Sequence, residues 1–186
     1  MKKNNHEIEI KFEVKNSDSI RKILSKYRAK FTGKAFERTV RFDTLDKGLE
    51  KNQKFLRVRT GFKNTITFKQ KIENKRFRER KEIELEIKDP EKMIMILKSL
   101  GFTKILIMEK YREKWLFENT EIVIDKLPMG TFIEIEGSEK SIDKVVEILN
   151  LDSEERILGT YWDLWRDFTK KKKINQENIV FKKKSA

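Results

Sequence analysis

The sequence predicts an α+β fold in which seven or eight antiparallel strands close into a barrel, with a polar, charged interior and helices packed outside. Two features predict it. Several segments carry a charged side chain at every second position, with Ile, Val, Leu or Phe between them, so each strand has one charged and one apolar face. Apolar residues at helical spacing near 20–27, 93–100 and 142–149 can cover the apolar faces.

The alternative is an open antiparallel sheet whose charged face lies in water. The sorting of charge argues against it, because most strands carry one sign and the two signs balance, with six cations against eight acids. The alternating polar positions are Glu7, Glu9, Lys11, Arg57, Arg59, Thr67, Lys69, Glu82, Glu84, Glu86, Lys110, Arg112, Asp125, Glu134 and Glu136.

Local patterns place the elements of the first half of the chain. Period-two alternation marks strands, apolar residues three and four apart mark helices, and polar or basic runs mark loops. In chain order they predict a strand over 7–12, a helix near 18–29, a strand near 35–43, a polar loop over 45–53 with room for one helical turn, strands over 54–61 and 65–70, a mobile basic loop over 71–80 and a strand over 82–88.

The best-marked element is a helix that begins at Pro90, with Asp89 as its N-cap, and stops at Gly101. The remaining elements are strands near 103–118, 120–127 and 131–137 and helices near 141–149 and 153–168. Residues 1–168 are therefore predicted to form one domain. Residues 169–186 hold seven lysines and one glutamate, which predicts a disordered tail.

Composition excludes several classes of site. The 186 residues include no cysteine, which excludes disulfides, zinc thiolate sites and cysteine nucleophiles. The single histidine, His6, excludes a multi-histidine metal site. No segment approaches the ~20 apolar residues of a membrane span, so a cytoplasmic protein without membrane contact is expected. The net charge of +13 favours nucleic acid, a membrane surface or a small phosphorylated ligand, although solubility alone explains it equally well.

An interior with both signs of charge suits particular chemistry. Guanidinium and ammonium groups bind phosphate oxygens, and clustered carboxylates accept a hard divalent ion that relieves their repulsion. Bare nucleic acid would need no acids there. The pattern therefore favours a metal–triphosphate complex as ligand, with nucleic acid not expected as the main one.

The alternating motifs, taken in order, resemble the CYTH family of triphosphate tunnel metalloenzymes over about residues 6–168. That family includes class IV adenylyl cyclases, thiamine triphosphatases and inorganic triphosphatases. The resemblance implies an eight-stranded tunnel, a bound Mg²⁺ or Mn²⁺ and a substrate that ends in a triphosphate. It assigns phosphate or substrate binding to Lys11, Arg57, Arg59, Glu84, Glu86, Lys110 and Arg112, metal binding to Glu7, Glu9, Asp125, Glu134 and Glu136, and water activation to Lys69.

The resemblance leaves the reaction open. Arg41 and Phe42 stand where the family's triphosphatases often carry tyrosine, the segment Thr44-Leu45-Asp46 is closer to the hydrolases, and residues 159–164 are similar to the cyclase-type C-terminus. Hydrolysis is favoured over cyclisation of ATP to cyclic AMP, because cyclisation needs a nucleoside pocket and an activated ribose hydroxyl.

Two further questions stay open at this level. Trp162 and Trp165 can stack on a base, although aromatic residues at helical spacing more often pack in a core. A barrel that binds polyphosphate or RNA without turnover is the remaining functional alternative. The oligomeric state is undetermined, with a homodimer as one option.

Overall fold

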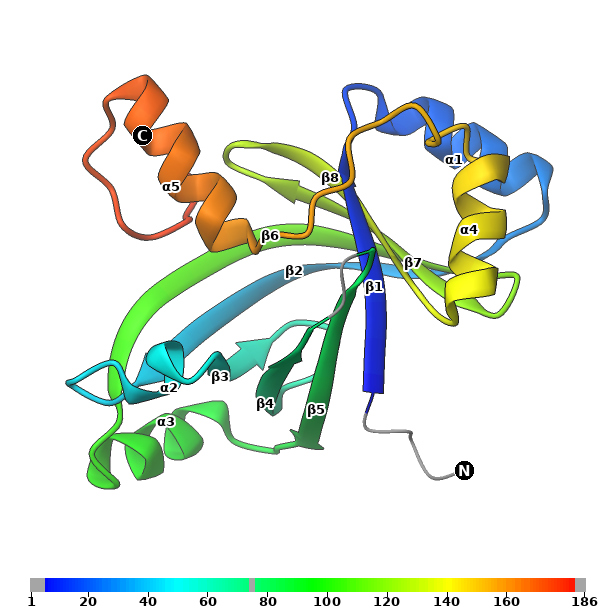
Figure 1. The fold of residues 1–186 in the computed structure, drawn as a ribbon. Coiled ribbons are helices and arrows are strands. Elements are labelled where there is room, and N and C mark those ends of the chain that lie inside the picture. Colours follow the sequence, from blue (N-terminus) through cyan, green and yellow to red (C-terminus); the bar gives the residue numbers. More distant parts are fainter. Residues whose placement is uncertain (1–5, 74–75, 183–186) are drawn as a thin grey trace.

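The computed structural model describes residues 6–73 and 76–182. Their eight strands form a closed antiparallel barrel in the order β1–β5–β4–β3–β2–β6–β7–β8, and β8 pairs again with β1 (Figure 1). The strands are β1 (His6–Glu13), β2 (Lys30–Asp43), β3 (Lys54–Thr60), β4 (Thr65–Ile72), β5 (Arg78–Glu86), β6 (Thr103–Phe117), β7 (Thr120–Leu127) and β8 (Gly130–Glu136). The α+β barrel expected from the sequence is confirmed.

Both faces of the barrel wall are buried, which distinguishes this fold from an open sheet with one wet face. On β1, the outward-facing Ile10 and Phe12 are 0% exposed, and the inward-facing Lys11 between them is only 1% exposed. The alternation therefore separates an outer apolar layer from an inner charged layer, and closure of the sheet encloses the inner layer.

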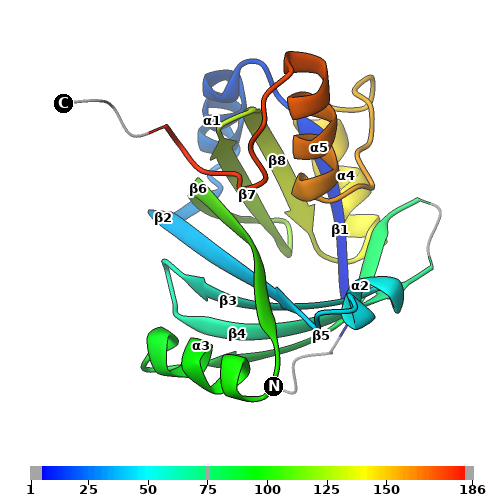
Figure 2. The same cartoon turned by 90° about the vertical axis from the view of Figure 1, so that its left-hand side faces the viewer.

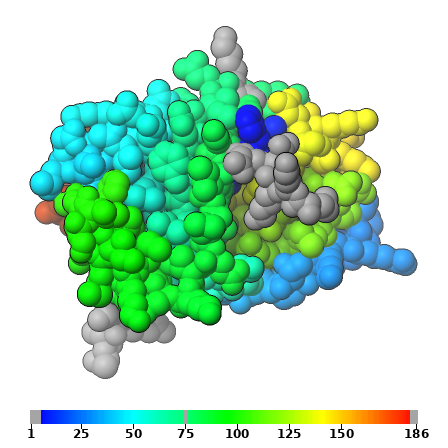
Figure 3. Space-filling model, turned by 90° about the horizontal axis from the view of Figure 1, so that it is seen from below, coloured from blue at the N-terminus to red at the C-terminus, as the bar shows by residue number. Residues whose placement is uncertain are grey.

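Helices cover the apolar outer faces. The helices α1 (Ser17–Lys26) and α4 (Glu139–Ile148) pack against outward-facing side chains of β1, β7 and β8. The helix α3 (Pro90–Ser99) packs on the far side against β2, β3 and β4. In Figures 1 and 2, α1 and α4 lie above the barrel and α3 below it, and Figure 3 shows α3 (green) on that lower face. No helix within the described residues is long and apolar enough to cross a membrane.

The segment predicted as a mobile basic loop over 71–80 is mostly strand. β4 continues to Ile72 and β5 begins at Arg78, while residues 74 and 75 lie outside the described part of the chain. Pairing with β1 explains the difference, because Arg78 lies opposite Glu9 and Arg80 opposite Glu7. Residues 78–81 are all charged, so the sequence shows no alternation of charged and apolar residues there.

Two other boundaries differ from the prediction. β2 begins at Lys30, because a bulge near Gly33, where φ is 142°, carries the strand through the expected break. The helix expected over 153–168 is α5 (Tyr161–Lys172), and it begins one residue after a capping box formed by Thr160 and Asp163. A short helix, α2 (Gly48–Lys51), lies within the predicted polar loop.

The prediction of a disordered tail over 169–186 is wrong for residues 169–182. Thr169–Lys172 belong to α5, and Ile179 beyond it is 0% exposed. The backbone N–H of Ile179 donates to the carbonyl of Ile107 (2.9 Å), and the N–H of Glu109 donates to the carbonyl of Ile179 (2.7 Å). We call residues 176–181 the C-terminal strap. Residues 183–186 lie outside the described part.

The strap forms because one edge of β6 needs partners. β6 pairs with β7 only from Tyr111 onward, so the backbone groups around Met108 would otherwise lie unpaired on that side. The strap supplies a short parallel bridge there and accepts a hydrogen bond from the indole of Trp165 at the carbonyl of Gln176 (2.9 Å). It therefore fastens α5 to the barrel.

Removing the strap is expected to destabilise the protein. Ile179→Ala should lower the free energy of unfolding by about 2–5 kcal/mol, the usual cost of truncating a fully buried isoleucine. A chain that ends at Phe168 should lose at least as much, because α5 would be shortened and held less firmly. Denaturant unfolding measures both effects, and a chain that ends at Lys182 is the control. Unchanged stability in both variants would contradict the structural role of the strap.

Candidate functional site

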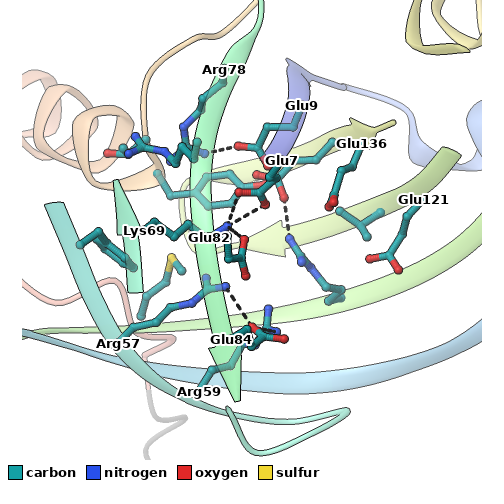
Figure 4. A pocket seen from close by; sticks show the side chains of 18 of the residues that line it. Glu7, Glu9, Arg57, Arg59, Lys69, Arg78, Glu82, Glu84, Glu121 and Glu136 are labelled. Carbon is teal, nitrogen blue, oxygen red and sulfur yellow. Dashed lines mark hydrogen bonds and ion pairs between the residues drawn. The ribbon is translucent and has the colours of Figure 1, made fainter. Parts of the chain in front are cut away.

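The barrel encloses a cavity of about 480 Å³, a size typical of small-molecule sites. Charged side chains from opposite strands line it (Figure 4). Its cations are Arg57, Arg59, Lys69, Arg78, Arg80, Lys110, Arg112 and Lys114, and its acids are Glu7, Glu9, Glu82, Glu84, Glu121, Glu134 and Glu136. Most residues expected at the site thus come together in one place, although β1, β3, β4, β5, β6 and β8 are far apart in sequence.

Asp125 is the anchor of the cation array rather than part of the cavity wall. It is 0% exposed and accepts hydrogen bonds from Lys110 Nζ (2.9 Å), Arg112 Nε (2.7 Å) and the hydroxyl of Tyr161 (2.9 Å). All of its surroundings are therefore occupied by protein donors. The expectation that Asp125 binds metal does not fit this placement, and its contacts instead fix the direction of Lys110 and Arg112.

Glu134 is also held by cations. Its carboxylate lies 3.1 Å from Lys11 Nζ and 2.6 Å from Arg112 Nη2. Burial alone would raise the pKa of Glu134, but Lys11, Arg112 and Lys110 together hold that pKa well below its ordinary value. Lys11 itself lies behind the lining, where it also donates to the carbonyl of Gly159 (3.4 Å).

Lys69 is clamped between two carboxylates. Its Nζ lies 2.5 Å from Glu7 Oε2 and 2.7 Å from Glu82 Oε2. Burial would raise the pKa of Glu82, and the neighbouring Lys69 lowers it. Figure 4 shows these three side chains meeting near the centre of the cavity. In this arrangement Lys69 is placed to orient Glu7 and Glu82 and to donate to a ligand.

Arg57 and Arg59 lie on β3, the strand next to the one that carries Lys69, and make weaker contacts. Arg59 Nη2 lies 3.2 Å from Glu84 Oε2, whereas Arg57 makes a 3.3 Å hydrogen bond to Thr67 Oγ1 and lies 4.0 Å from Glu84. Burial, followed by repulsion from Arg59, lowers the pKa of Arg57. Arg57 is therefore a buried cation whose own protein environment compensates its charge only weakly.

A row of three glutamates crosses the wall opposite these arginines. In the strand register Glu136 lies opposite Glu9 on one side and opposite Glu121 on the other. Glu9 is paired with Arg78 and Glu121 with Lys114, but Glu136 has no ion pair or hydrogen bond among the described residues. Enclosure by the barrel wall, followed by repulsion from Glu7, raises the pKa of Glu136 to about 8.

This row fits a divalent cation. Like charges directly opposite one another on neighbouring strands are destabilising, and a hard cation with oxygen ligands relieves the repulsion. Within the described residues no three acidic or histidine side chains already surround one point, because cations hold Glu7, Glu9 and Glu134. Glu136 is the carboxylate that is free to take a cation, with Glu9 and Glu7 as its neighbours.

Arg80 is the matching unpaired cation. It lines the cavity, it has no ion-pair partner in the described part of the chain, and its Nε makes no hydrogen bond. Burial, followed by repulsion from Arg78, lowers the pKa of Arg80 to about 10. A cavity that offers one free carboxylate and one free guanidinium can bind a cation and an anion together.

One expected residue lies elsewhere. Glu86 is exposed at the end of β5 and pairs with Lys63 at 2.6 Å, outside the cavity lining. It shares a strand face with Glu84, but β5 has passed the end of the cavity by that point. The structure therefore does not place Glu86 with the other expected site residues, and its role in substrate binding stays a prediction.

The sequence reasoning missed several residues at the site. Arg78 and Arg80 continue the period-two series of Glu82 and Glu84, so extending that count backward would have found them. Glu37 is 2% exposed and lies 3.7 Å from Lys110 Nζ. Burial opposes its ionisation, but Arg112 and Lys110 lower the pKa of Glu37 to about 2. The strand alternation could not indicate Tyr161, because this residue enters the barrel interior from the helix α5.

The comparisons with known proteins agree with this geometry. The model of the CYTH domain matches residues 5–161, which is most of the chain. The chain belongs to the CYTH family. Members of this family are typically enzymes that act on triphosphate-bearing substrates with divalent metals.

Three relatives illustrate the family likeness. A protein of Methanocaldococcus jannaschii named as a candidate adenylate cyclase is 31% identical over 170 residues, which cover 85% of this chain and 97% of that protein. The structure of PH1012 from Pyrococcus horikoshii is 30% identical with a TM-score of 0.73, covering 83% of this chain and 96% of that one. HpAC1 of Hippeastrum, a candidate adenylyl cyclase described with a dominant triphosphatase activity, shares the fold at 17% identity and a TM-score of 0.65, covering 87% and 95% of the two chains.

Neutralising Glu136 is expected to stabilise the protein at high pH. The folded chain keeps the Glu136 proton up to about pH 8, whereas the unfolded chain ionises near the ordinary pKa of 4.5, so wild-type stability falls as pH rises between these values. Glu136→Gln should therefore raise the midpoint temperature of unfolding at pH 9, measured with a chelator, and leave it nearly unchanged at pH 4. The exposed Glu155→Gln is the control. An equal shift at both pH values would show that repulsion at Glu136 is absent.

Proposed function

We propose that the protein is a divalent-metal-dependent phosphohydrolase that cleaves a triphosphate-bearing substrate. The observation that carries this proposal is a pair of groups that line one cavity and have no ion-pair partner among the described residues. They are the carboxyl group of Glu136, which keeps its proton up to about pH 8 unless a cation replaces it, and the guanidinium of Arg80. A metal–triphosphate complex supplies the opposite charge at both places at once. Family membership supports the same class of substrate.

The cations divide into two groups by what holds them. Lys110 and Arg112 are fixed by Asp125, so they present preorganised charge to phosphate oxygens. Arg57 and Arg59 extend this array on β3, on the other side of β2, and their weaker contacts let them turn toward a ligand. A triphosphate that lies along both groups gains charge-assisted hydrogen bonds from each.

Mg²⁺ or Mn²⁺ would be held by Glu136 with Glu9 and Glu7, and when bound it would neutralise phosphate charge and lower the pKa of a coordinated water. The protein's own part is to position the phosphates and to stabilise charge, which is most of what phosphoryl transfer requires. No protein nucleophile is needed.

Cyclisation of ATP is the second candidate, and the identity to the Methanocaldococcus jannaschii protein favours it. The two reactions differ in what they release. Hydrolysis of the terminal bond yields phosphate, and cyclisation yields pyrophosphate and a cyclic nucleotide. Hydrolysis is preferred because it needs only the phosphates, a metal and water. Cyclisation also needs a base for a ribose hydroxyl, and in this proposal Glu136, the unpaired carboxyl group of the described cavity, serves the metal.

Metal-dependent release of phosphate from a panel of triphosphates tests the proposal. Phosphate should appear with Mg²⁺ or Mn²⁺ and disappear with a chelator. Arg57→Gln should lower kcat by roughly 10²–10³, the usual effect of removing one preorganised charge-stabilising donor, with little change in stability. Arg38→Gln, on the outer face of β2, is the matched control. If pyrophosphate and a cyclic nucleotide are the sole products, the reaction is cyclisation and the proposal of hydrolysis is wrong.

Lys69→Ala distinguishes two roles of this residue in hydrolysis. If Lys69 activates water, the variant should lower kcat and remove one ionisation from its pH profile, with KM changed less. If Lys69 only orients Glu7, Glu82 and the phosphates, KM should rise while the pH dependence of kcat stays intact. Because two carboxylates hold its ammonium group, we expect the second result.

A further inference from the structure

The N-terminal turn of α5 brings aromatic side chains to different places. Tyr161 enters the barrel, where its ring centre lies 4.3 Å from Lys11 Nζ and its hydroxyl bonds Asp125. Trp165 packs away from the cavity under the strap and is 5% exposed. Trp162 follows Tyr161 by one residue, or about 100° around the helix, and its side chain lines the cavity.

Trp162 differs from the other tryptophan of this helix in two ways. It is only partly buried, and its indole N–H has no hydrogen-bond partner among the described residues, whereas the indole of Trp165 bonds the carbonyl of Gln176. A tryptophan that serves packing alone usually has its N–H satisfied when buried. The cluster around Ile179 and Trp165 supports Trp162 from behind, so it presents a fixed ring to the cavity.

The cavity is not the same at its two ends. Along β6 it is lined by Met108 near α5 and by Lys114 six residues later, which is roughly 20 Å for an extended strand. At the Lys114 end the lining is charged, with Lys114 paired to Glu121 at 3.0 Å and Glu136 opposite Glu121. At the α5 end the lining holds Met108 and Trp162 and is therefore suited to an organic group.

Arg80 lines the same cavity as Trp162. The carboxylate of Asp163, the residue after Trp162, contributes to its electrostatic environment, although the two form no ion pair. Asp163 is already engaged by the capping box and by Arg166 at 2.9 Å. The guanidinium of Arg80 thus remains available to a ligand in this cavity.

We infer that Trp162 and Arg80 form a specificity subsite for the group that the triphosphate carries. Trp162 stacks on a flat aromatic ring, and Arg80 binds the phosphate next to it. The inference rests on the proposed function and narrows its substrate class to a triphosphate joined to an aromatic base, such as a nucleoside triphosphate, in preference to inorganic triphosphate.

Calorimetric binding in the presence of Mn²⁺ tests this subsite without turnover. The probes are an ATP analogue with a β–γ imido bridge and inorganic tripolyphosphate. Trp162→Ala should weaken binding of the analogue by about fivefold or more, as expected for lost base stacking, and change binding of tripolyphosphate by less than about twofold. Trp162→Phe should retain most of the affinity for the analogue. Arg80→Gln should weaken the binding of both probes.

Phe36→Ala is the matched control, because Phe36 is a 44% exposed aromatic residue outside the cavity lining. It should affect neither probe. If Trp162→Ala loses affinity for both probes equally, the role of the residue is structural. If it keeps its affinity for both probes, the subsite is also overturned. Failure of the proposed function looks different, since wild-type protein would bind both probes yet release no phosphate from any triphosphate.

Discussion

The structure depends on compensating charge inside a closed barrel. Charged side chains removed from water are tolerated only when they are paired and hydrogen-bonded, because their desolvation is costly. Asp125 is the clearest case, since it is completely buried and neutralised by Lys110, Arg112 and Tyr161. The outer apolar layer and its helices stabilise the barrel, but the ion pairs of the inner layer decide which side chains are fixed and which stay available.

The function follows from the places where this compensation is incomplete. Glu136 lies between two other glutamates, and Arg80 forms no ion pair within the described residues although it lies opposite Glu7. Each of these groups is stabilised by a ligand of opposite charge, so binding a metal and a phosphate would complete the network. The same reasoning makes Asp125 a poor candidate for the metal, because it is completely buried, lies outside the cavity lining and already accepts from Lys110, Arg112 and Tyr161.

The C-terminal strap links the fold to this site. Ile179 pairs with the free edge of β6 and holds α5, and α5 in turn delivers Tyr161 to Asp125 and Trp162 to the cavity. The match to the CYTH domain ends at residue 161, so most of α5 and the whole strap lie beyond it. This chain therefore completes its interior with a segment outside the part that defines the family.

The sequence by itself determined which side chains face inward on each strand, because period-two alternation is a local property of the backbone. It thereby predicted the barrel and the presence of Arg57, Lys69 and Glu134 in its interior. Only the tertiary structure decided how far each strand runs past the cavity and which charges meet across it, since strand register and closure depend on distant segments. For that reason Glu86 fell outside, Arg80 and Glu136 were left unpaired, and a lysine-rich tail became a structured strap.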